Sequence, residues 1–105
     1  MNLVDDPEFP HAGVTVETRT GHGPRGDQFA SPVTRTVIVE DGRQLVRDAT
    51  GEQVVSETTL YDRLDAASLY AVGSKVAVGN RTARVIVAKR RERDDDVEHV
   101  EVALT

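Results

Sequence analysis

Residues 74–89 read SKVAVGNRTARVIVAK, and this stretch decides the fold. Apolar and polar side chains alternate on both sides of Gly79-Asn80, which is the pattern of two half-buried strands. A glycine-asparagine pair between two such runs is typical of a tight hairpin turn. We therefore expect an antiparallel hairpin here, extended into a meander by a third strand over residues 97–104 (VEHVEVAL).

The alternation in the last of these strands also predicts which side chains face the core. Val100, Val102 and Leu104 share one face and are expected to point inward. His99, Glu101 and Ala103 occupy the opposite face and are expected to point outward.

The rest of the chain repeats the pattern of short strands. Seventeen Val and ten Thr residues supply β-branched side chains, which suit a pleated surface. Val14 and Val16 share the inner face of the first strand, and Val37 and Val39 that of the second. The expected strands cover residues 13–18 (GVTVET), 34–40 (TRTVIVE), 44–48 (QLVRD) and 52–61 (EQVVSETTLY).

Turn signals separate these strands. Asp41-Gly42 predicts a two-residue hairpin, because a type I′ turn needs positive φ at both central positions. A second turn is expected over residues 49–51. Residues 64–71 (LDAASLYA) predict the one helical turn of the chain, with Asp65 as its cap and Gly73 as its end.

Together these patterns predict an all-β protein: a small β-barrel built of short meander strands. At 105 residues the chain is long enough for one domain. We expect an extended N-terminal arm over residues 1–12, because Pro7 and Pro10 oppose a helix there. A single barrel domain is expected over residues 13–105, with a long glycine-rich loop over residues 19–32.

Composition narrows the class of protein. The chain has no cysteine, so it has neither disulfides nor thiolate metal sites. Its first residues lack the apolar region of a signal peptide, and no apolar run approaches the length of a membrane helix. The formal net charge of -5 opposes generic nucleic-acid binding. We expect a soluble protein that is made in the cytoplasm and binds no membrane.

The stretch TGHGPRGD (20–27) contains two well-known motifs. Gly21, Gly23 and Gly26 spell the dinucleotide-binding pattern G-x-G-x-x-G, but Pro32 and a strand pattern follow where that fold needs a helix. Arg25-Gly26-Asp27 spells the cell-attachment tripeptide, which acts outside cells. Neither motif has the surroundings that its function needs. A long loop in a compact domain is usually either functional or disordered, so the stretch is of interest for its length rather than for either motif.

No set of residues in the sequence has the spacing of a catalytic or metal site. His11, His22 and His99 have no second ligand at a recognisable distance along the chain, and no serine lies in a nucleophile elbow. The basic run KRRER (89–93) is followed directly by three aspartates, which cancel its charge. The sequence therefore predicts a non-enzymatic protein with no cofactor and no metal.

Three stretches in this order carry a family resemblance: LVRDATGEQV (45–54), VGSKVAVGNRTARVIV (72–87) and HVEVALT (99–105). Over residues 13–105 the chain resembles the head-closure proteins, or head-to-tail stoppers, of long-tailed bacteriophages, especially those of actinobacteria. GPRGDQF (23–29), followed by a strand, is similar to the loop region of that family. The ratio of 11 Arg to 2 Lys fits a GC-rich coding sequence.

The resemblance implies a β-barrel that forms a ring in the virion neck, a hexamer or alternatively a dodecamer. Such a ring lies between two parts of the virion. On one side is the portal with its adaptor, and on the other is the tail with its terminator and tube. It closes the channel after DNA packaging and joins head to tail, contacting viral double-stranded DNA non-specifically as it passes. The protein would then belong to the virion after synthesis in the bacterial cytoplasm.

The resemblance also suggests where the functional residues lie. The channel or gating loop would contain Arg19, Gly21, His22, Gly23, Arg25, Gly26, Asp27 and Phe29. Contacts between rings would involve Phe9 in the arm and Arg90, Arg91 and Asp95 around the last hairpin.

Two alternatives stay open at this point. The chain could be another protein of the same junction, a tail terminator or an adaptor, although adaptors are typically rich in helix. It could instead be a small nucleic-acid-binding β-barrel, which would use Arg81, Arg84, Lys89, Arg90 and Arg91. That interpretation lacks the aromatic side chains on which bases stack.

Overall fold

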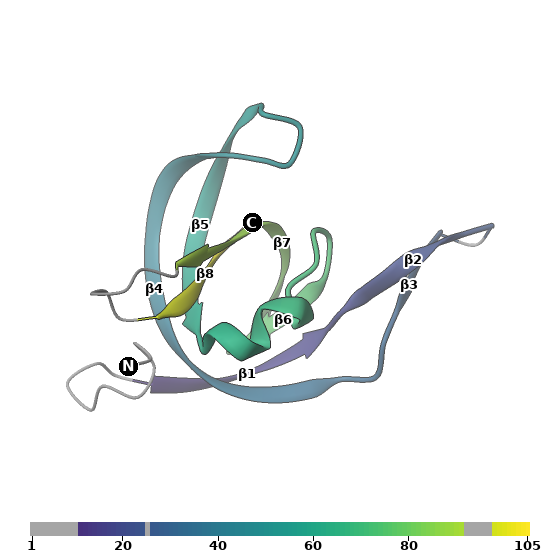
Figure 1. Cartoon of the computed structure of the whole chain (residues 1–105), viewed down its shortest axis with the longest axis horizontal. Helices are drawn as coiled ribbons and strands as arrows, with labels where there is room; N and C mark the ends of the chain where they lie inside the picture. The colour runs from purple at the N-terminus through teal and green to yellow at the C-terminus, as the bar shows by residue number, and fades with distance from the viewer. Residues whose placement is uncertain (1–10, 25, 92–97) are drawn as a thin grey trace.

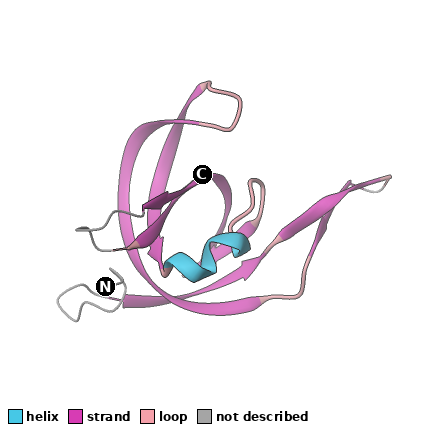
Figure 2. Cartoon of the chain, in the orientation of Figure 1, coloured by secondary structure: helices cyan, strands magenta, loops and turns pink. Residues whose placement is uncertain are grey.

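The computed structural model describes residues 11–24, 26–91 and 98–105, and it is almost entirely β-structure (Figures 1 and 2). Six strands form a closed barrel: β1 (His11–Glu17), β4 (Val33–Arg47), β5 (Gln53–Asp62), β6 (Lys75–Val78), β7 (Arg81–Arg91) and β8 (His99–Leu104). A separate two-stranded sheet consists of β2 (Arg19–Gly23) and β3 (Gly26–Phe29), and a short 3₁₀ helix, η2, covers Leu64–Leu69.

The barrel strands follow the order β1-β4-β5-β8-β7-β6, and β6 pairs with β1 to close the ring. All of these pairs are antiparallel. The meander expected for the last three strands is confirmed, since β6, β7 and β8 are neighbours in sequence order. The turn at Gly79-Asn80 is confirmed as well: it links β6 to β7, and Gly79 has a φ of 59°.

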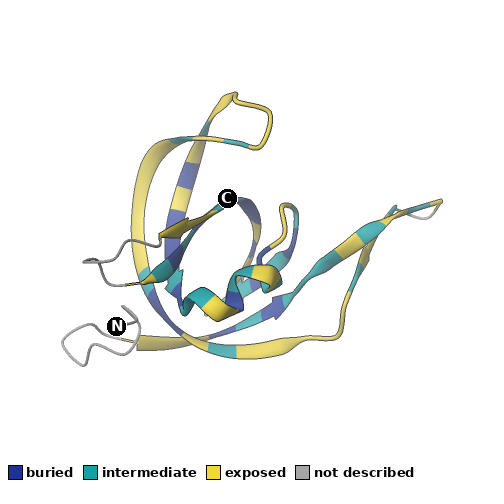
Figure 3. Ribbon diagram, viewed as in Figure 1, coloured by how far each residue is buried: buried dark blue, intermediate teal, exposed yellow. Residues whose placement is uncertain are grey.

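The core fills the barrel interior mainly with aliphatic side chains, together with Tyr70, and the buried residues form a band along the strands (Figure 3). The inward residues predicted for β8 are confirmed, because Val100, Val102 and Leu104 are fully buried. The outward position expected for Ala103 does not leave it exposed: it is buried as well, between its neighbours Thr59 on β5 and Val87 on β7. The predicted inner face of the first strand is confirmed by buried Val14 and Val16. The core members are Val14, Val16, Val37, Leu60, Ala66, Tyr70, Val76, Ala83, Val85, Val100, Val102 and Leu104.

The hairpin expected at Asp41-Gly42 is wrong. Strand β4 continues through these residues, and its pairing with β5 shifts register between Asp41 and Gln44. Gly42 does not have the positive φ that a type I′ turn requires. The extra residue forms a β-bulge, in which Asp41 Oδ1 accepts a hydrogen bond of 3.1 Å from Thr58 Oγ1.

The chain reverses instead at the second expected turn. Asp48 Oδ1 accepts hydrogen bonds from the backbone N–H of Thr50 (2.9 Å) and Glu52 (3.1 Å) and from the Thr50 hydroxyl (2.6 Å). Gly51 takes the left-handed conformation, with a φ of 89°. This turn satisfies several backbone groups locally, and so the β4–β5 hairpin becomes long.

The expectation that residues 19–32 form a long loop is also wrong. Most of it forms the β2–β3 hairpin, with pairs that run from Arg19–Phe29 to Gly23–Gly26. Among its described glycines only Gly26 has a positive φ, of 103°. The G-x-G-x-x-G glycines therefore lie in two paired strands, and no helix follows them.

Two smaller boundaries differ from expectation. The helical turn is confirmed as η2, but Arg63 rather than Asp65 occupies its N-cap position, and no side chain caps it. The turn also ends earlier than expected, at Leu69, with Tyr70 rather than Gly73 as its C-cap. The first strand begins at His11, so that the final two residues of the expected arm belong to the barrel. The remaining arm residues, 1–10, lie outside the described part of the chain. Within that part, no helix is long and apolar enough to cross a membrane.

Candidate functional site

The β2–β3 hairpin extends away from the barrel and is the most prominent feature of its surface (Figure 1). It follows directly from β1 and leads directly into β4, so both of its ends are fixed to barrel strands. A two-stranded sheet alone is marginally stable in water. Contacts at its base therefore decide how firmly the hairpin is held.

Hydrogen bonds fix the base of the hairpin to the barrel rim. The Ala30 amide donates to the Thr18 carbonyl at 2.7 Å, which closes the hairpin on itself. The Thr18 hydroxyl donates to the carbonyl of Leu69 at 2.7 Å, and the Arg19 amide donates to buried Ser74 Oγ at 2.8 Å. The hairpin base is thus attached to the segment that links η2 to β6.

Asp27 connects three cationic or titratable side chains. Its Oδ1 lies 3.2 Å from Arg19 Nη2 and 3.0 Å from His22 Nδ1, and its Oδ2 lies 3.6 Å from Arg84 Nη1 on β7. The hydrogen bond with His22, together with the two guanidinium groups, lowers the pKa of the Asp27 carboxyl. Asp27 therefore remains ionised at neutral pH and joins both strands of the hairpin to the barrel.

Phe29 provides the second contact between hairpin and barrel. The ammonium group of Lys75 lies 4.4 Å from the centre of the Phe29 ring, and the Arg84 guanidinium carbon lies 5.2 Å from it. Lys75 and Arg84 face each other directly across β6 and β7. Two like charges in that position repel, and the electron-rich ring face of Phe29 attracts both.

A buried ionic network lies beside η2. Asp62, which is fully buried, accepts bonds from Arg35 Nη2 (2.9 Å) and Nε (3.0 Å), from the Tyr70 hydroxyl (2.5 Å) and from the Arg63 amide (2.6 Å). Burial alone would raise the pKa of Asp62, but these donors lower it overall. Burial and the bond to Asp62 raise the pKa of Tyr70. The network ties β4, β5 and η2 together.

The outer part of the β4–β5 hairpin forms a second projection, which we call the β4–β5 arm (residues 43–57; Figure 1). Among the described residues, β1 pairs with β4 only as far as Ile38, and β8 pairs with β5 only from Thr58. Within the arm Leu45 and Val55 are directly opposite each other, and their residues are 66% and 46% exposed. They form an apolar patch that nothing in the described chain covers.

A groove of about 350 Å³ lies at the other end of the barrel, between η2 and strands β7 and β8. Its walls are mainly apolar, and Arg90 is the one charged residue among those that line it. Val72, one of its walls, is 43% exposed. The lining residues are Ala67, Ser68, Tyr70, Ala71, Val72, Val87, Ala88, Arg90 and Val100.

The structure brings together four of the residues assigned to the channel loop, Arg19, His22, Asp27 and Phe29. Gly21, Gly23 and Gly26 complete the same hairpin, whereas Arg25 lies outside the described residues. Of the residues assigned to inter-ring contacts, Arg90 and Arg91 lie at the end of β7, and Arg91 pairs with Glu101 at 2.9 Å. Phe9 and Asp95 lie outside the described residues.

Sequence reasoning missed the partners of these residues. Lys75 did not enter the expected site at all, and Arg84 entered only as a nucleic-acid contact. The buried network of Asp62, Arg35 and Tyr70 was missed too. Its signal was Asp62 itself, which shares the inward face of its strand with Leu60.

Comparisons with known proteins do not assign the chain to a family. No protein-family model matches the chain, and no curated protein matches it either. Within residues 11–24, 26–91 and 98–105, no group of three or more His, Asp or Glu side chains is placed to hold a metal ion.

Proposed function

We propose that this protein is a structural component of a bacteriophage neck, a head-closure or stopper subunit that forms a ring and has no enzymatic activity. One observation carries the proposal: a closed β-barrel holds a separate β-hairpin at the position where the resemblance places the channel loop. The ordered motifs in residues 45–54, 72–87 and 99–105 supply the family to which that arrangement is compared.

In this proposal the β2–β3 hairpin is the part that closes the channel. A hairpin of this kind is a cooperative unit that can open separately from the barrel, and its paired strands present a more fixed barrier than a disordered loop would. The contacts of Asp27 and Phe29 with the barrel would hold one position of the hairpin. Their release would allow another position when DNA has to pass.

Charge is consistent with a channel that DNA passes through without being gripped. Fixed cations that contact phosphates add affinity. Here Asp27 pairs with two arginines of the hairpin region, Arg19 and Arg84, and the whole chain has a formal net charge of -5. Asp27 offsets only part of the charge at the hairpin base, where Arg84 and Lys75 also lie, so weak attraction of DNA depends on the net negative charge of the whole chain.

The alternatives receive less support. An adaptor would be expected to be rich in helix, and the described part of the chain contains one helix of six residues. A nucleic-acid-binding barrel would need its cations available, but Arg81 donates to the Thr105 carbonyl at 2.9 Å and Arg84 to the Gly73 carbonyl at 2.9 Å. The third alternative, a tail terminator of the same junction, stays open.

Electron microscopy of phage particles made without this protein tests the proposal. We expect heads that package DNA and then lose it, together with detached tails. Supplying the wild-type gene from a plasmid should restore intact virions and serves as the control. Normal infectious virions from the deletion strain would overturn the proposal.

A further inference from the structure

We propose that the base of the β2–β3 hairpin is a binding site for a phosphate group, and that a phosphate bound there releases the hairpin from the barrel. Arg19, Lys75 and Arg84 provide the hydrogen-bond donors of this site. The inference deepens the proposed function and rests on it, because in a neck ring the phosphate belongs to the backbone of the DNA in the channel.

The hairpin base carries more positive than negative charge. Three cations lie there, Arg19 from the hairpin and Lys75 and Arg84 from the barrel. Among the described residues, Asp27 is the carboxylate that forms ion pairs with them, and it reaches only the two arginines. Glu17 lies opposite Lys75 on β1, but no ion pair joins these two side chains. Three cations against two carboxylates leave one positive charge in excess.

Gly73 holds the two arginines close together. Arg84 Nη1 donates to the Gly73 carbonyl at 2.9 Å, and a Cβ placed on Gly73 would lie only 2.9 Å from Arg19 Cδ. A guanidinium group has five N–H donors, so Arg84 has further donors beyond this bond. The side chains of Arg19 and Arg84 are 35% and 45% exposed. Both guanidinium groups are therefore positioned by the fold and still open to a ligand from solvent.

Asp27 satisfies these cations only in part. Its Oδ2 lies 3.6 Å from Arg84 Nη1, whereas a charge-assisted hydrogen bond between such groups is about 2.7–2.9 Å long. Within the described structure Arg19 Nε is buried without a hydrogen-bond acceptor, and a buried donor without a partner costs free energy. Lys75 contacts the ring of Phe29 rather than a carboxylate. The site therefore has donors that a second anion can use.

A phosphate group fits the barrel side of this site better than the Asp27 carboxylate does. Lys75 and Arg84 face each other across β6 and β7, and two like charges in that position repel. A phosphate placed between them gives each cation an oxygen and removes the repulsion. Arginine also binds phosphate in a bidentate manner. Asp27 cannot take that place while it is paired with Arg19 in the hairpin.

Phosphate binding competes with the contacts that hold the hairpin against the barrel. Arg84 is the barrel residue that Asp27 reaches, and Lys75 and Arg84 are the cations that Phe29 contacts. The hydrogen bond from the Thr18 hydroxyl is not part of this competition, so the hairpin stays attached at its base while it opens. The formal net charge of -5 keeps the contact weak, so that passing DNA is not held.

Titration of the unmodified protein with inorganic phosphate tests the site. When phosphate replaces chloride at constant ionic strength and pH, two-dimensional NMR should show saturable shifts of the Arg19, Lys75 and Arg84 backbone signals. Hydrogen exchange of the β2 and β3 amides should become faster with phosphate, while exchange in β5 and β8 stays unchanged. A short DNA duplex should produce the same two changes, because its backbone carries the same group.

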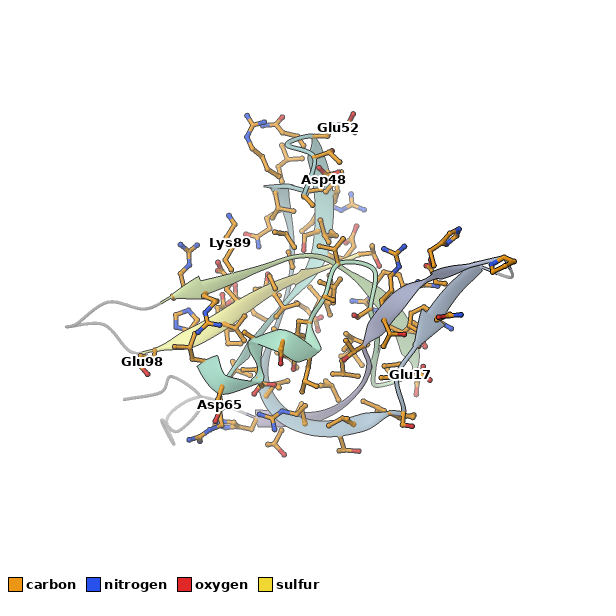
Figure 4. The ribbon with its side chains drawn as sticks, turned by 45° about the vertical axis from the view of Figure 1, so that its right-hand side comes forward. Glu17, Asp48, Glu52, Asp65, Lys89 and Glu98 are labelled. Atoms are coloured by element: carbon orange, nitrogen blue, oxygen red, sulfur yellow. The ribbon has the colours of Figure 1, made fainter. Side chains whose placement is uncertain are left out.

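The two lysines of the chain supply a matched pair of variants. Lys75→Gln should weaken phosphate binding by up to about fivefold, which corresponds to the loss of one exposed ion pair. Lys89→Gln makes the same change of charge on the other side of the barrel from Glu17 and the hairpin base, and it should leave binding unchanged (Figure 4).

A second pair of variants tests the competition. Asp27→Asn removes the competing carboxylate and should strengthen phosphate binding. Glu57→Gln also removes a carboxylate paired with an arginine, Arg43, but it lies on the β4–β5 arm and should have no effect.

Three results would overturn the inference. Equal phosphate affinity of Lys75→Gln and Lys89→Gln would rule out the site. Phosphate binding without faster exchange in β2 and β3 would rule out the release of the hairpin. Changes caused by inorganic phosphate but not by the duplex would rule out DNA as the source of the group. None of these results alters the deletion phenotype, so failure of this inference is distinguishable from failure of the proposed function.

Discussion

Lys75 and Arg84 face each other across β6 and β7, and both lie against the ring of Phe29 from the β2–β3 hairpin. This relationship links the hairpin to the barrel. Two cations that would repel each other share one aromatic ring, while Asp27 of the same hairpin reaches Arg84 as well. The hairpin is therefore held by contacts that can be removed one at a time.

Phe29→Ala should loosen the hairpin while the barrel stays folded. Cation–π contacts at exposed sites contribute about 0.5–1 kcal/mol, and Phe29 lies outside the core. We expect faster hydrogen exchange of the β2 and β3 amides and unchanged exchange in β5 and β8. Gln28→Ala, next to it on the same strand, is the matched control. Slower exchange in the Phe29 variant, or equal exchange in both variants, would contradict this account.

Asp62→Asn should destabilise the whole domain. Removal of one member of a buried ion pair costs about 3–5 kcal/mol, and the lower end applies because the Arg35 side chain is 26% exposed. Urea denaturation measures the change in the free energy of unfolding. Asp65→Asn, at an exposed position of η2, should change that free energy by less than about 0.5 kcal/mol. Equal stability of the two variants would rule out a structural role for the network.

The same network predicts acid sensitivity. The pKa of Asp62 is lowered in the folded protein, so the folded state binds its proton more weakly than the unfolded state does. Its contribution is fully present above the unfolded value of about 3.9 and is lost as the pH falls through the lower folded value. Thermal unfolding between pH 7 and pH 2 should show this loss below about pH 4. The loss should be smaller in Asp62→Asn, and an identical profile would contradict the assignment.

Glycine substitutions separate the observed β4–β5 connection from the one expected from sequence. Gly42→Ala should be neutral or slightly stabilising, because Gly42 lacks positive φ and a methyl group there meets no atom within 4 Å. Gly51→Ala should destabilise by about 1 kcal/mol or more, because Gly51 has a φ of 89°. Thermal unfolding of both variants measures the difference. If Gly42→Ala were the more destabilising of the two, the result would instead support the turn expected at Asp41-Gly42.

The strands were predictable because alternation is a local signal. Val14, Val16, Val100 and Val102 are buried where the period of two places them. The β2–β3 hairpin was not, because glycines and polar residues give no alternation, and its stability depends on the distant Arg84. The bulge at Asp41 was missed for a similar reason: its partner, Thr58, lies in another strand.

The resemblance indicated a position for the functional loop but not its contacts. Lys75 and Arg84 reach Phe29 only after the barrel closes β6 onto β1. Likewise, the groove exists only where η2 folds back across β7 and β8, which no short sequence pattern reports. Non-local pairing of this kind could not be inferred from a single sequence.

Cryo-electron microscopy of the intact phage particle tests the central claim most directly. We predict that this barrel repeats around the axis between portal and tail, with the β2–β3 hairpin of every copy directed at the channel. A neck reconstruction in which every density is assigned to other chains would contradict the claim.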